Sequence, residues 1–240
     1  MQPDYQFAIE HRKSIRTYSP EPIADKTREY LINKIEEINQ ESGLHITWID
    51  DAKDIFSTFK SYGMFKNVGS VLVVKGLKEV PDLPERAGYF GEQLVLEATS
   101  LGLGTCWIAG TYDKKNSLLS VGQGETILSL ISIGNIADSQ SLKQKIIHTL
   151  KRKTLAVEKF YTAEGVVPTW FIAGIEAVQK APSAINSQRV RFRYSKGKVT
   201  ASVPGSRATD PIDMGIAKFH FAVIAGGTFD FGAEGSFRKL

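Results

Sequence analysis

The apolar positions of the chain follow two different spacings, which together predict a mixture of helices and strands. A helix is predicted from Asp25, a candidate N-cap, to about Gln40, and Gly43 is expected to end it. Four apolar residues recur at helical spacing within this segment: Tyr30, Leu31, Ile35 and Ile38. A second helix, Gly88 to Leu101, is apolar over much of its surface and should be central to the fold.

Shorter apolar runs predict strands. The run from Val71 to Val74 is apolar without alternation, which is typical of a strand that is buried on both faces. Further elements expected in the first half are short helices at 3–11 and 141–150, strands at 45–49 and 127–136, and an extended segment at 102–110.

The second half repeats the order of the first half. After a connection at 164–168, the predicted elements are a helix at 169–180, a hairpin of strands at 190–194 and 199–203, and a largely apolar helix at 212–225 that ends at Gly226. We interpret the recurrence over 25–101 and 169–225 as a structural duplication in an α+β fold, with halves 1–163 and 164–240. Because residue identity between the copies is low, the alternative is that any α+β chain can show this order.

Composition narrows the class of protein. The 240 residues allow one large domain or two small ones, and 42% hydrophobic with 23% charged residues is ordinary for a soluble globular protein. The single cysteine, Cys106, excludes intrachain disulfides and agrees with a cytoplasmic location. Neither a signal peptide nor an apolar run of about 18 residues is present, so no membrane contact is expected. The net charge of +4 is mild, which favours a small anionic partner over nucleic acid, or simple solubility.

A basic segment follows the first predicted helix and contains Arg12, Lys13, Ser14 and Arg16. Guanidinium groups and a serine hydroxyl are well suited to hold a phosphate. Alternation places Arg12, Ser14 and Arg16 on one side if the segment is extended. A second basic group is Lys151-Arg152-Lys153. The alternative for both groups is a solvated basic surface.

The segment between Gly102 and Gly110 could accept a flat ligand. Glycine allows a ligand to approach the backbone closely, and the N–H of Ala109 or Gly110 could donate to a ring nitrogen. The alternative is a helix cap at Gly102 that leads into a buried strand.

The turn from Ala181 to Gln188 is the most specific feature. Ser183, Asn186 and Gln188 offer donors and acceptors around one turn, which suits the polar edge of a heterocycle. The alternative is a helix-to-strand turn in which the serine and asparagine side chains bond their own backbone.

These segments contain no catalytic dyad. Ser14 and Ser183 lack a histidine partner in the pattern, and the four histidines are too scattered to bind a metal. Cys106 lies in an apolar segment and is interpreted as a packed residue. An enzyme without such groups would need a cofactor to supply the chemistry.

Together these segments resemble the flavin-dependent nitroreductase family, in particular its internally duplicated, single-chain members. Residues 12–18 resemble the family's R-x-S-x-R-x-(F/Y) motif, and 181–188 resemble its A-P-S-x-x-N-x-Q segment. Residues 88–92 and 102–107 resemble its central helix and following strand, and 213–221 its second central helix. The resemblance covers nearly the whole chain, and the first two motifs are specific in combination.

The resemblance implies a nitroreductase-like α+β fold with central antiparallel sheets and long apolar helices. Members of the family are homodimers with flavin sites at the subunit interface. Here the R-x-S-x-R segment lies in the first half of the chain and the A-P-S-x-x-N-x-Q segment in the second. The resemblance therefore implies an intrachain pseudo-dimer with one complete FMN site, and a monomeric protein.

Position by position, the resemblance implies a set of FMN-binding residues but neither a catalytic side chain nor a metal. These are Arg12, Lys13, Ser14 and Arg16 at the phosphate and ribityl chain, Lys151 and Lys153 as added charge, Ile108, Ala109 and Gly110 beside the ring with the Gly110 N–H near N5, Pro182, Ser183, Ala184 and Asn186 over the ring, and Gln188 as support. Two positions depart from the family: Arg189-Val190 replaces a frequent Pro-Trp, and Ala109 replaces a frequent acidic residue.

The function that this resemblance implies is an FMN-dependent NAD(P)H oxidoreductase. It would reduce small electron-poor acceptors, such as nitroaromatics or quinones, by hydride transfer through flavin N5. Two alternatives remain open. One is a flavin-binding or regulatory module without turnover, and the other is a scaffold that binds a different anionic ligand at Arg12, Arg16 and Lys151.

Overall fold

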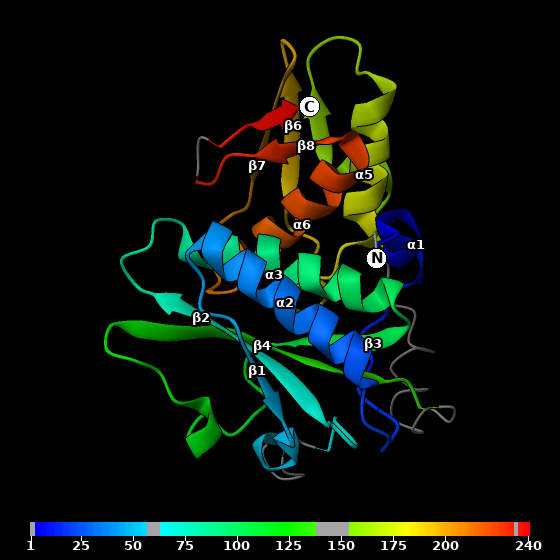
Figure 1. Cartoon of the computed structure of the whole chain (residues 1–240). Helices are drawn as coiled ribbons and strands as arrows, with labels where there is room; N and C mark the ends of the chain where they lie inside the picture. Colours follow the sequence, from blue (N-terminus) through cyan, green and yellow to red (C-terminus); the bar gives the residue numbers. More distant parts are fainter. Residues whose placement is uncertain (1–2, 57–62, 138–153, 233–234) are drawn as a thin grey trace. The chain divides into compact units, whose positions relative to one another are not determined.

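A computed structural model describes residues 3–56, 63–137, 154–232 and 235–240 (Figure 1). The chain divides into two compact units, each built from separate stretches of sequence. Unit 1 comprises Met1–Asp4, His11–Val80 and Leu94–Arg152, and unit 2 comprises Tyr5–Glu10, Pro81–Gln93 and Lys153–Leu240. The predicted halves 1–163 and 164–240 were defined by a structural duplication. The division into compact units does not test whether two halves are related, so the boundary at 163/164 stays a prediction. The expected helix at 141–150 lies outside the described residues.

Unit 1 contains a four-stranded antiparallel sheet with strand order β1-β2-β4-β3 (Figure 1). Its strands are β1 (Thr47–Asp50), β2 (Ser70–Leu77), β3 (Leu103–Ile108) and β4 (Glu125–Asn135). The first five residues of β2 are buried, which explains its apolar run without alternation. Val71 and Val73 belong to a core cluster with Ile55 and Phe56 of the 3-10 helix η1 (Ala52–Phe56). All four strands were predicted, with ends that differ by a few residues.

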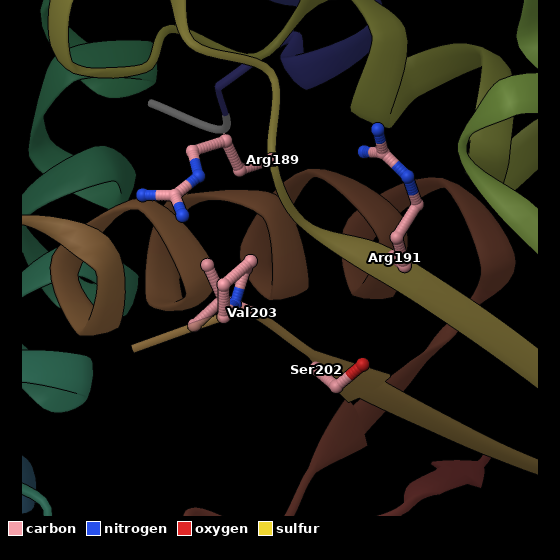
Figure 2. Close-up of a pocket in the computed structure, with 5 residues that line it drawn as sticks. Arg189, Arg191, Ser202 and Val203 are labelled. Atoms are coloured by element: carbon pink, nitrogen blue, oxygen red, sulfur yellow. The ribbon is translucent and has the colours of Figure 1, made fainter. Parts of the chain in front are cut away.

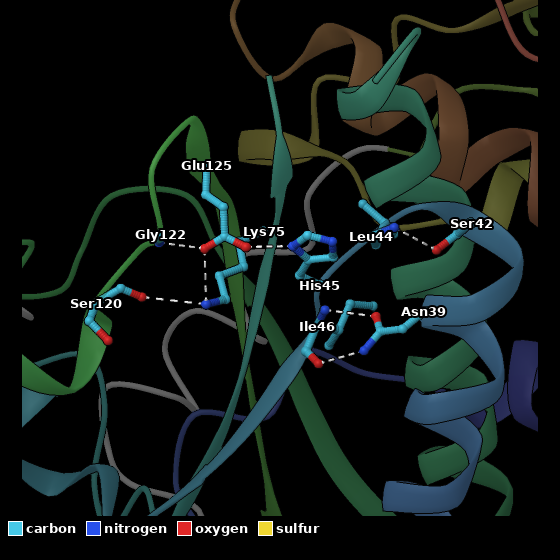
Figure 3. A network of polar contacts seen from close by, with 9 residues as sticks. All are labelled: Asn39, Ser42, Leu44, His45, Ile46, Lys75, Ser120, Gly122 and Glu125. Carbon is cyan, nitrogen blue, oxygen red and sulfur yellow. Dashed lines mark hydrogen bonds and ion pairs between the residues drawn. The ribbon is translucent and has the colours of Figure 1, made fainter. Parts of the chain in front are cut away.

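Helix α2 (Asp25–Ser42) ends as predicted, because Gly43 adopts the left-handed conformation with φ 71°. The prediction that Asp25 is the N-cap is wrong. Ala24 occupies that position without a side-chain cap, and Asp25 is the first helical residue, where its negative charge still favours the helix N-terminus. Asn39 then fixes the chain before β1, since its side chain bonds both the N–H and the C=O of Ile46 at 2.7 and 2.9 Å (Figure 3).

Glu125, at the start of β4, joins three segments of unit 1 (Figure 3). Its carboxylate lies 2.5 Å from His45 Nδ1, accepts the Gly122 N–H at 2.6 Å, and pairs with Lys75 of β2 at 3.3 Å. The hydrogen bond with His45, then the Gly122 N–H and Lys75, lower the pKa of Glu125 to about 2. The ionised group therefore ties the segment before β1 to β2 and β4.

Helix α3 (Leu83–Ser100) begins before the predicted Gly88, because Pro84 falls in its first turn, where proline is tolerated. Its first part belongs to unit 2 and its last part to unit 1. Within unit 1, Tyr30 of α2 donates a hydrogen bond to Glu97 of α3 at 2.7 Å. None of the helices in the described ranges is both apolar and long enough to cross a membrane.

Unit 2 is built around two helices, α5 (Thr169–Lys180) and α6 (Asp210–Ala225). The bounds of α5 match the prediction, and Gly226 ends α6 in the left-handed conformation, as expected. The predicted hairpin is β6 (Arg191–Ser195) with β7 (Lys198–Ser202). Unit 2 also contains most of α1 (Tyr5–His11), two 3-10 helices, η3 (Val157–Lys159) and η4 (Ala184–Asn186), and three short strands that were not predicted: β5 (Tyr161–Ala163), β8 (Gly227–Phe229) and β9 (Phe237–Lys239). Strand β5 runs parallel to β6.

Within unit 2, the first part of α3 packs against α6 so closely that glycines of each helix contact the backbone of the other. A Cβ atom at Gly88 would lie 2.0 Å from the carbonyl oxygen of Ile212, and one at Gly215 would lie 1.9 Å from that of Glu85. Helix α6 is buried along most of its length, so its polar side chains need partners. Lys218 bonds Glu85 at 2.5 Å, and His220 lies 2.9 Å from Glu92.

Candidate functional site

The basic segment lies alongside strand β3 in unit 1. Ser14 forms a parallel bridge with Thr105, and the Ile15 N–H donates to the Thr105 carbonyl at 2.8 Å. Arg12, Ser14 and Arg16 are half-buried, whereas Lys13 is exposed. The segment is therefore fixed against the sheet and is not a freely solvated loop.

Two paired glycines make room for this segment. Gly104 of β3 is the partner of Gly134 of β4. A Cβ atom at Gly104 would lie 2.9 Å from the Ile15 side chain, and one at Gly134 would lie 2.9 Å from the Tyr18 ring. Ile15 and Tyr18 are both buried, and the Tyr18 hydroxyl donates to the Ile15 carbonyl at 2.7 Å. Gly104 thus allows contact with Ile15, and its role is packing within the protein.

The charges of the basic segment affect the pKa of the buried thiol of Cys106. Burial raises the pKa of Cys106, while the positive charges of Arg16 and Arg12 and a hydrogen bond from Ser14 oppose that rise. The cysteine is 3% exposed, so the prediction of a packed residue is confirmed. The two arginines therefore lie close to β3, on the strand that continues to Ile108.

The end of β3 differs from its start. Ile108 is buried, whereas Ala109 and Gly110 are exposed. A Cβ atom at Gly110 would meet nothing within 4 Å, and Gly110 is not left-handed. Gly102, by contrast, has φ 81° after α3, so a cap is the correct interpretation there. Of the three glycines at 102, 104 and 110, Gly110 is thus the one that is required neither by its backbone conformation nor by packing.

The turn from Pro182 to Gln188 is strained. Ile185, Asn186 and Gln188 all have positive φ, at 52, 57 and 48°. Left-handed backbone is uncommon outside glycine, and it is an outlier for a β-branched residue such as Ile185. Ile185 is 75% exposed, while Pro182, Ser183, Ala184, Asn186 and Gln188 are half-buried.

A buried carboxylate on α6 holds this turn. Both oxygens of Asp213 accept the Ala184 N–H, at 2.9 and 3.2 Å, and the Ser187 hydroxyl donates to one of them at 3.3 Å. Within the turn, the Gln188 N–H donates to the Ser183 hydroxyl at 3.0 Å, so the alternative of self-bonding holds for Ser183. The Gln188 side chain accepts the N–H of Leu155 at 2.9 Å, which ties the turn to the chain before η3 (Val157–Lys159).

Two arginines follow the turn and line a pocket of about 420 Å³ with Ser202, Val203 and Pro204 (Figure 2). Arg189 bonds both oxygens of buried Asp210 at 3.0 Å. Arg191 donates to the carbonyls of Gln188 and Val190 at 2.7 and 2.8 Å. The two guanidinium groups point in different directions in Figure 2: Arg189 pairs with a side chain, whereas Arg191 bonds the backbone.

Asp213 and Asp210 were not predicted to support the turn. The sequence contains two signals: a pair of carboxylates in a helix that is otherwise largely apolar and, for Asp213, its place at the start of the segment 213–221. Arg189, which departs from the family pattern, is explained by its pairing with Asp210.

The predicted site residues are distributed over both units. Arg12 to Arg16 and Ile108 to Gly110 lie in unit 1, and Pro182 to Gln188 lie in unit 2. The approach of these segments to one another remains a prediction. Lys151 and Lys153 lie outside the described residues.

The antiparallel sheet, the long helices and the basic segment along β3 define the nitroreductase class of α+β fold, as the sequence predicted. The family described as "Putative TM nitroreductase" matches residues 5–225, and the chain belongs to this family.

One solved structure supports the fold, and two others match more weakly. The crystal structure of a "putative nitroreductase" from Thermotoga maritima MSB8 has a TM-score of 0.63 at 21% identity, covering 98% of this chain and 92% of that one. An FMN-dependent nitroreductase from Clostridium difficile R20291 matches with a TM-score of 0.47 at 19% identity, over 63% of this chain and 99% of its own. A nitroreductase with bound FMN from Bacteroides fragilis NCTC 9343 matches with a TM-score of 0.46 at 17% identity, over 65% and 96%. Among curated proteins, none matches the chain.

Proposed function

We propose that this chain binds FMN and is an NAD(P)H-dependent oxidoreductase that reduces small electron-poor acceptors, such as nitroaromatics or quinones. Membership of the nitroreductase family supports the class of protein. The observation that carries the proposal is the bridge between Ser14 and Thr105, which lays the basic segment along the strand that leads to Gly110. Groups suited to a phosphate and groups suited to a flat ring are thereby attached to the same strand.

The residues present fit the phosphate end of FMN. Arg12, Ser14 and Arg16 supply two guanidinium groups and a hydroxyl, which form charge-assisted hydrogen bonds with phosphate oxygens. In the proposed site these three residues hold the phosphate and ribityl chain. Lys13, Lys151 and Lys153 add positive charge.

The residues also fit the ring end. Ile108, Ala109 and Gly110 would lie beside the ring, with the exposed Gly110 N–H directed to N5, and the space above Gly110 is open. The second unit would contribute the cover of the ring through Pro182, Ser183, Ala184 and Asn186, with Gln188 as support. When bound, FMN supplies a carrier that accepts a hydride from NAD(P)H and passes it to the acceptor. The chain contributes positioning and N–H donors.

The proposal includes an assembly. Halves 1–163 and 164–240 would form an intrachain pseudo-dimer with one FMN, and the protein would be a monomer. The single cysteine supports a cytoplasmic location. A reaction between two small molecules at a flavin needs neither nucleic acid nor membrane as a partner.

Replacing Arg16 tests the phosphate end of the site. Arg16→Ala should weaken FMN binding about tenfold or more, since a hydrogen bond to a charged group contributes roughly 1.5–3 kcal/mol and about 1.4 kcal/mol is a factor of ten. Visible absorbance during FMN titration gives the dissociation constant. Arg193→Ala is the matched control, because Arg193 is exposed and pairs with Glu164.

Two outcomes would contradict parts of the proposal. Wild-type protein that takes up no FMN would refute flavin binding, and unchanged affinity in Arg16→Ala would refute the phosphate site. Flavin uptake without NAD(P)H oxidation by any nitroaromatic or quinone would favour the alternative of a module without turnover.

A further inference from the structure

The turn from Pro182 to Gln188 needs support from outside itself. A left-handed residue other than glycine, asparagine or aspartate costs roughly 1–2 kcal/mol, and both Ile185 and Gln188 are of this kind. The side chain of Ile185 is 75% exposed, so packing does not repay this cost. The turn therefore keeps its shape through hydrogen bonds from neighbouring elements.

Asp213 provides hydrogen bonds on both sides of the strained residues. Ala184 precedes Ile185 and Asn186, and Ser187 follows them, and both donate to the Asp213 carboxylate. Asp213 lies at the start of α6 and is 4% exposed, so water does not compete for these bonds. The carboxylate thus spans the left-handed pair.

We propose that Asp213 is the positioning residue of the Pro182–Gln188 turn, and that its negative charge holds the turn in the conformation that retains the flavin. This inference rests on the proposed function, because it deepens the role of the segment that covers the ring. Asp213 acts through Ala184 and Ser187, and its own contact with flavin is not part of the proposal.

Two cations of the neighbouring elements, Arg189 and Lys218, pair with carboxylates other than Asp213. On its own helix, Asp210 lies one turn earlier and is paired with Arg189. The Arg207 N–H also bonds Asp210, and the charge of Arg207 reaches Asp213. On α3, which packs against α6, Glu85 is paired with Lys218.

These surroundings place the titration of Asp213 close to neutral pH. Burial raises the pKa of Asp213 to about 6, and the charge of Asp210 adds to the rise. The Ala184 N–H, the Ser187 hydroxyl and the charge of Arg207 lower it. The carboxylate is therefore ionised at pH 7 and takes up a proton as the pH falls through about 6.

Because the pKa of Asp213 is raised, a role in positioning the turn and a role in stabilising the whole protein predict opposite changes with pH. A raised pKa means that the folded protein binds the proton more tightly than the unfolded chain, so this group adds stability as the pH falls from about 6 toward 3.8. The charge-assisted bonds to Ala184 and Ser187 weaken over the same range. Global stability and retention of the flavin should therefore change in opposite directions.

The experiment compares wild type with Asp213→Asn between about pH 5 and about pH 8, a range that brackets the expected titration. In wild type without flavin, the NMR shift of the Ala184 amide should titrate with a midpoint near 6. The FMN dissociation constant should rise about tenfold more than in Asp213→Asn as the pH falls through that midpoint, since a charge-assisted hydrogen bond is lost. Asp213→Asn should show no titration of the Ala184 amide and should bind FMN about tenfold more weakly near neutral pH. Its FMN affinity should keep only the pH dependence that the FMN phosphate itself causes by taking up a proton at about pH 6.

Controls and outcomes keep the inference separate from the proposed function. Asp230→Asn, which alters an exposed pair with Arg238 in the same unit, should behave like wild type. An Ala184 amide that does not titrate, or whose titration persists in Asp213→Asn, overturns the role of Asp213. The same pH dependence of FMN affinity in wild type and in Asp213→Asn overturns it as well. A protein that binds no FMN refutes the proposed function together with flavin retention, whereas the amide titration by itself decides whether Asp213 holds the turn.

Discussion

Single glycines determine how closely backbones approach one another in this protein. Gly88 and Gly215 face each other's helices at distances that no Cβ atom tolerates, and neither adopts a left-handed conformation. Glycine is therefore required at these two positions because the two helices are in close contact there. Gly104 serves the packing of Ile15, while Gly102 serves a cap. All four residues are glycines, so the sequence does not distinguish their roles, whereas their surroundings in the structure do.

Adding one methyl group at Gly215 should destabilise the protein. A Cβ atom there would lie 1.9 Å from the Glu85 carbonyl, and overpacking of this kind costs about 1–3 kcal/mol or more. Urea denaturation of Gly215→Ala measures the loss in the free energy of unfolding. Gly110→Ala is the matched control, because its Cβ atom meets nothing within 4 Å and stability should not change. Equal stability of Gly215→Ala and wild type would refute the close approach of α3 and α6.

At the scale of elements, length decides what the sequence could predict. The bounds of α5 were predicted as observed because its apolar residues repeat over several turns. Strands β5, β8 and β9 have three residues each, which is too short for any period to be recognised. Their existence depends on pairing with segments elsewhere in the chain.

Removing the charge of Glu125 should loosen the junction of β2, β4 and the segment before β1. Its pKa is lowered from 4.5 to about 2, so its contribution to stability is present above about pH 4.5 and is lost as the pH falls toward 2. Glu125→Gln should lower the free energy of unfolding near neutral pH by about 1–2 kcal/mol. Its stability should also fall less than that of wild type over the acid range.

Denaturation midpoints measured from neutral to acid pH test this prediction. Glu36→Gln, at an exposed position on α2, is the control and should follow the wild-type curve. A Glu125→Gln curve that runs parallel to wild type below pH 4.5 would mean that the contacts with His45, Gly122 and Lys75 contribute nothing.

At the scale of the whole molecule, each compact unit is assembled from distant parts of the chain. Unit 2 takes Tyr5–Glu10 and Pro81–Gln93 in addition to its C-terminal stretch. The segments of the proposed flavin site are likewise distant in the sequence, at 12–16, 108–110 and 182–188.

The number of flavins per chain tests this arrangement. We expect one FMN per chain and a mass of 26.5 kDa for the protein part, because the pseudo-dimer would supply both sides of the site. Native mass spectrometry of the FMN-saturated protein measures mass and stoichiometry together. A species of twice that mass that needs both chains for each flavin would refute the monomeric site.

The sequence by itself determined the class of fold, the long helices and their glycine caps, and the motifs that resemble the nitroreductase family. Periodicity and caps are local properties, so they can be recognised without coordinates. The tertiary structure alone decided that Gly104 and Gly134 lie beneath Ile15 and Tyr18, and that Asp213 holds the turn at Ile185. These contacts join residues that are far apart in the chain, and their free energies depend on distance and burial, which no local pattern contains.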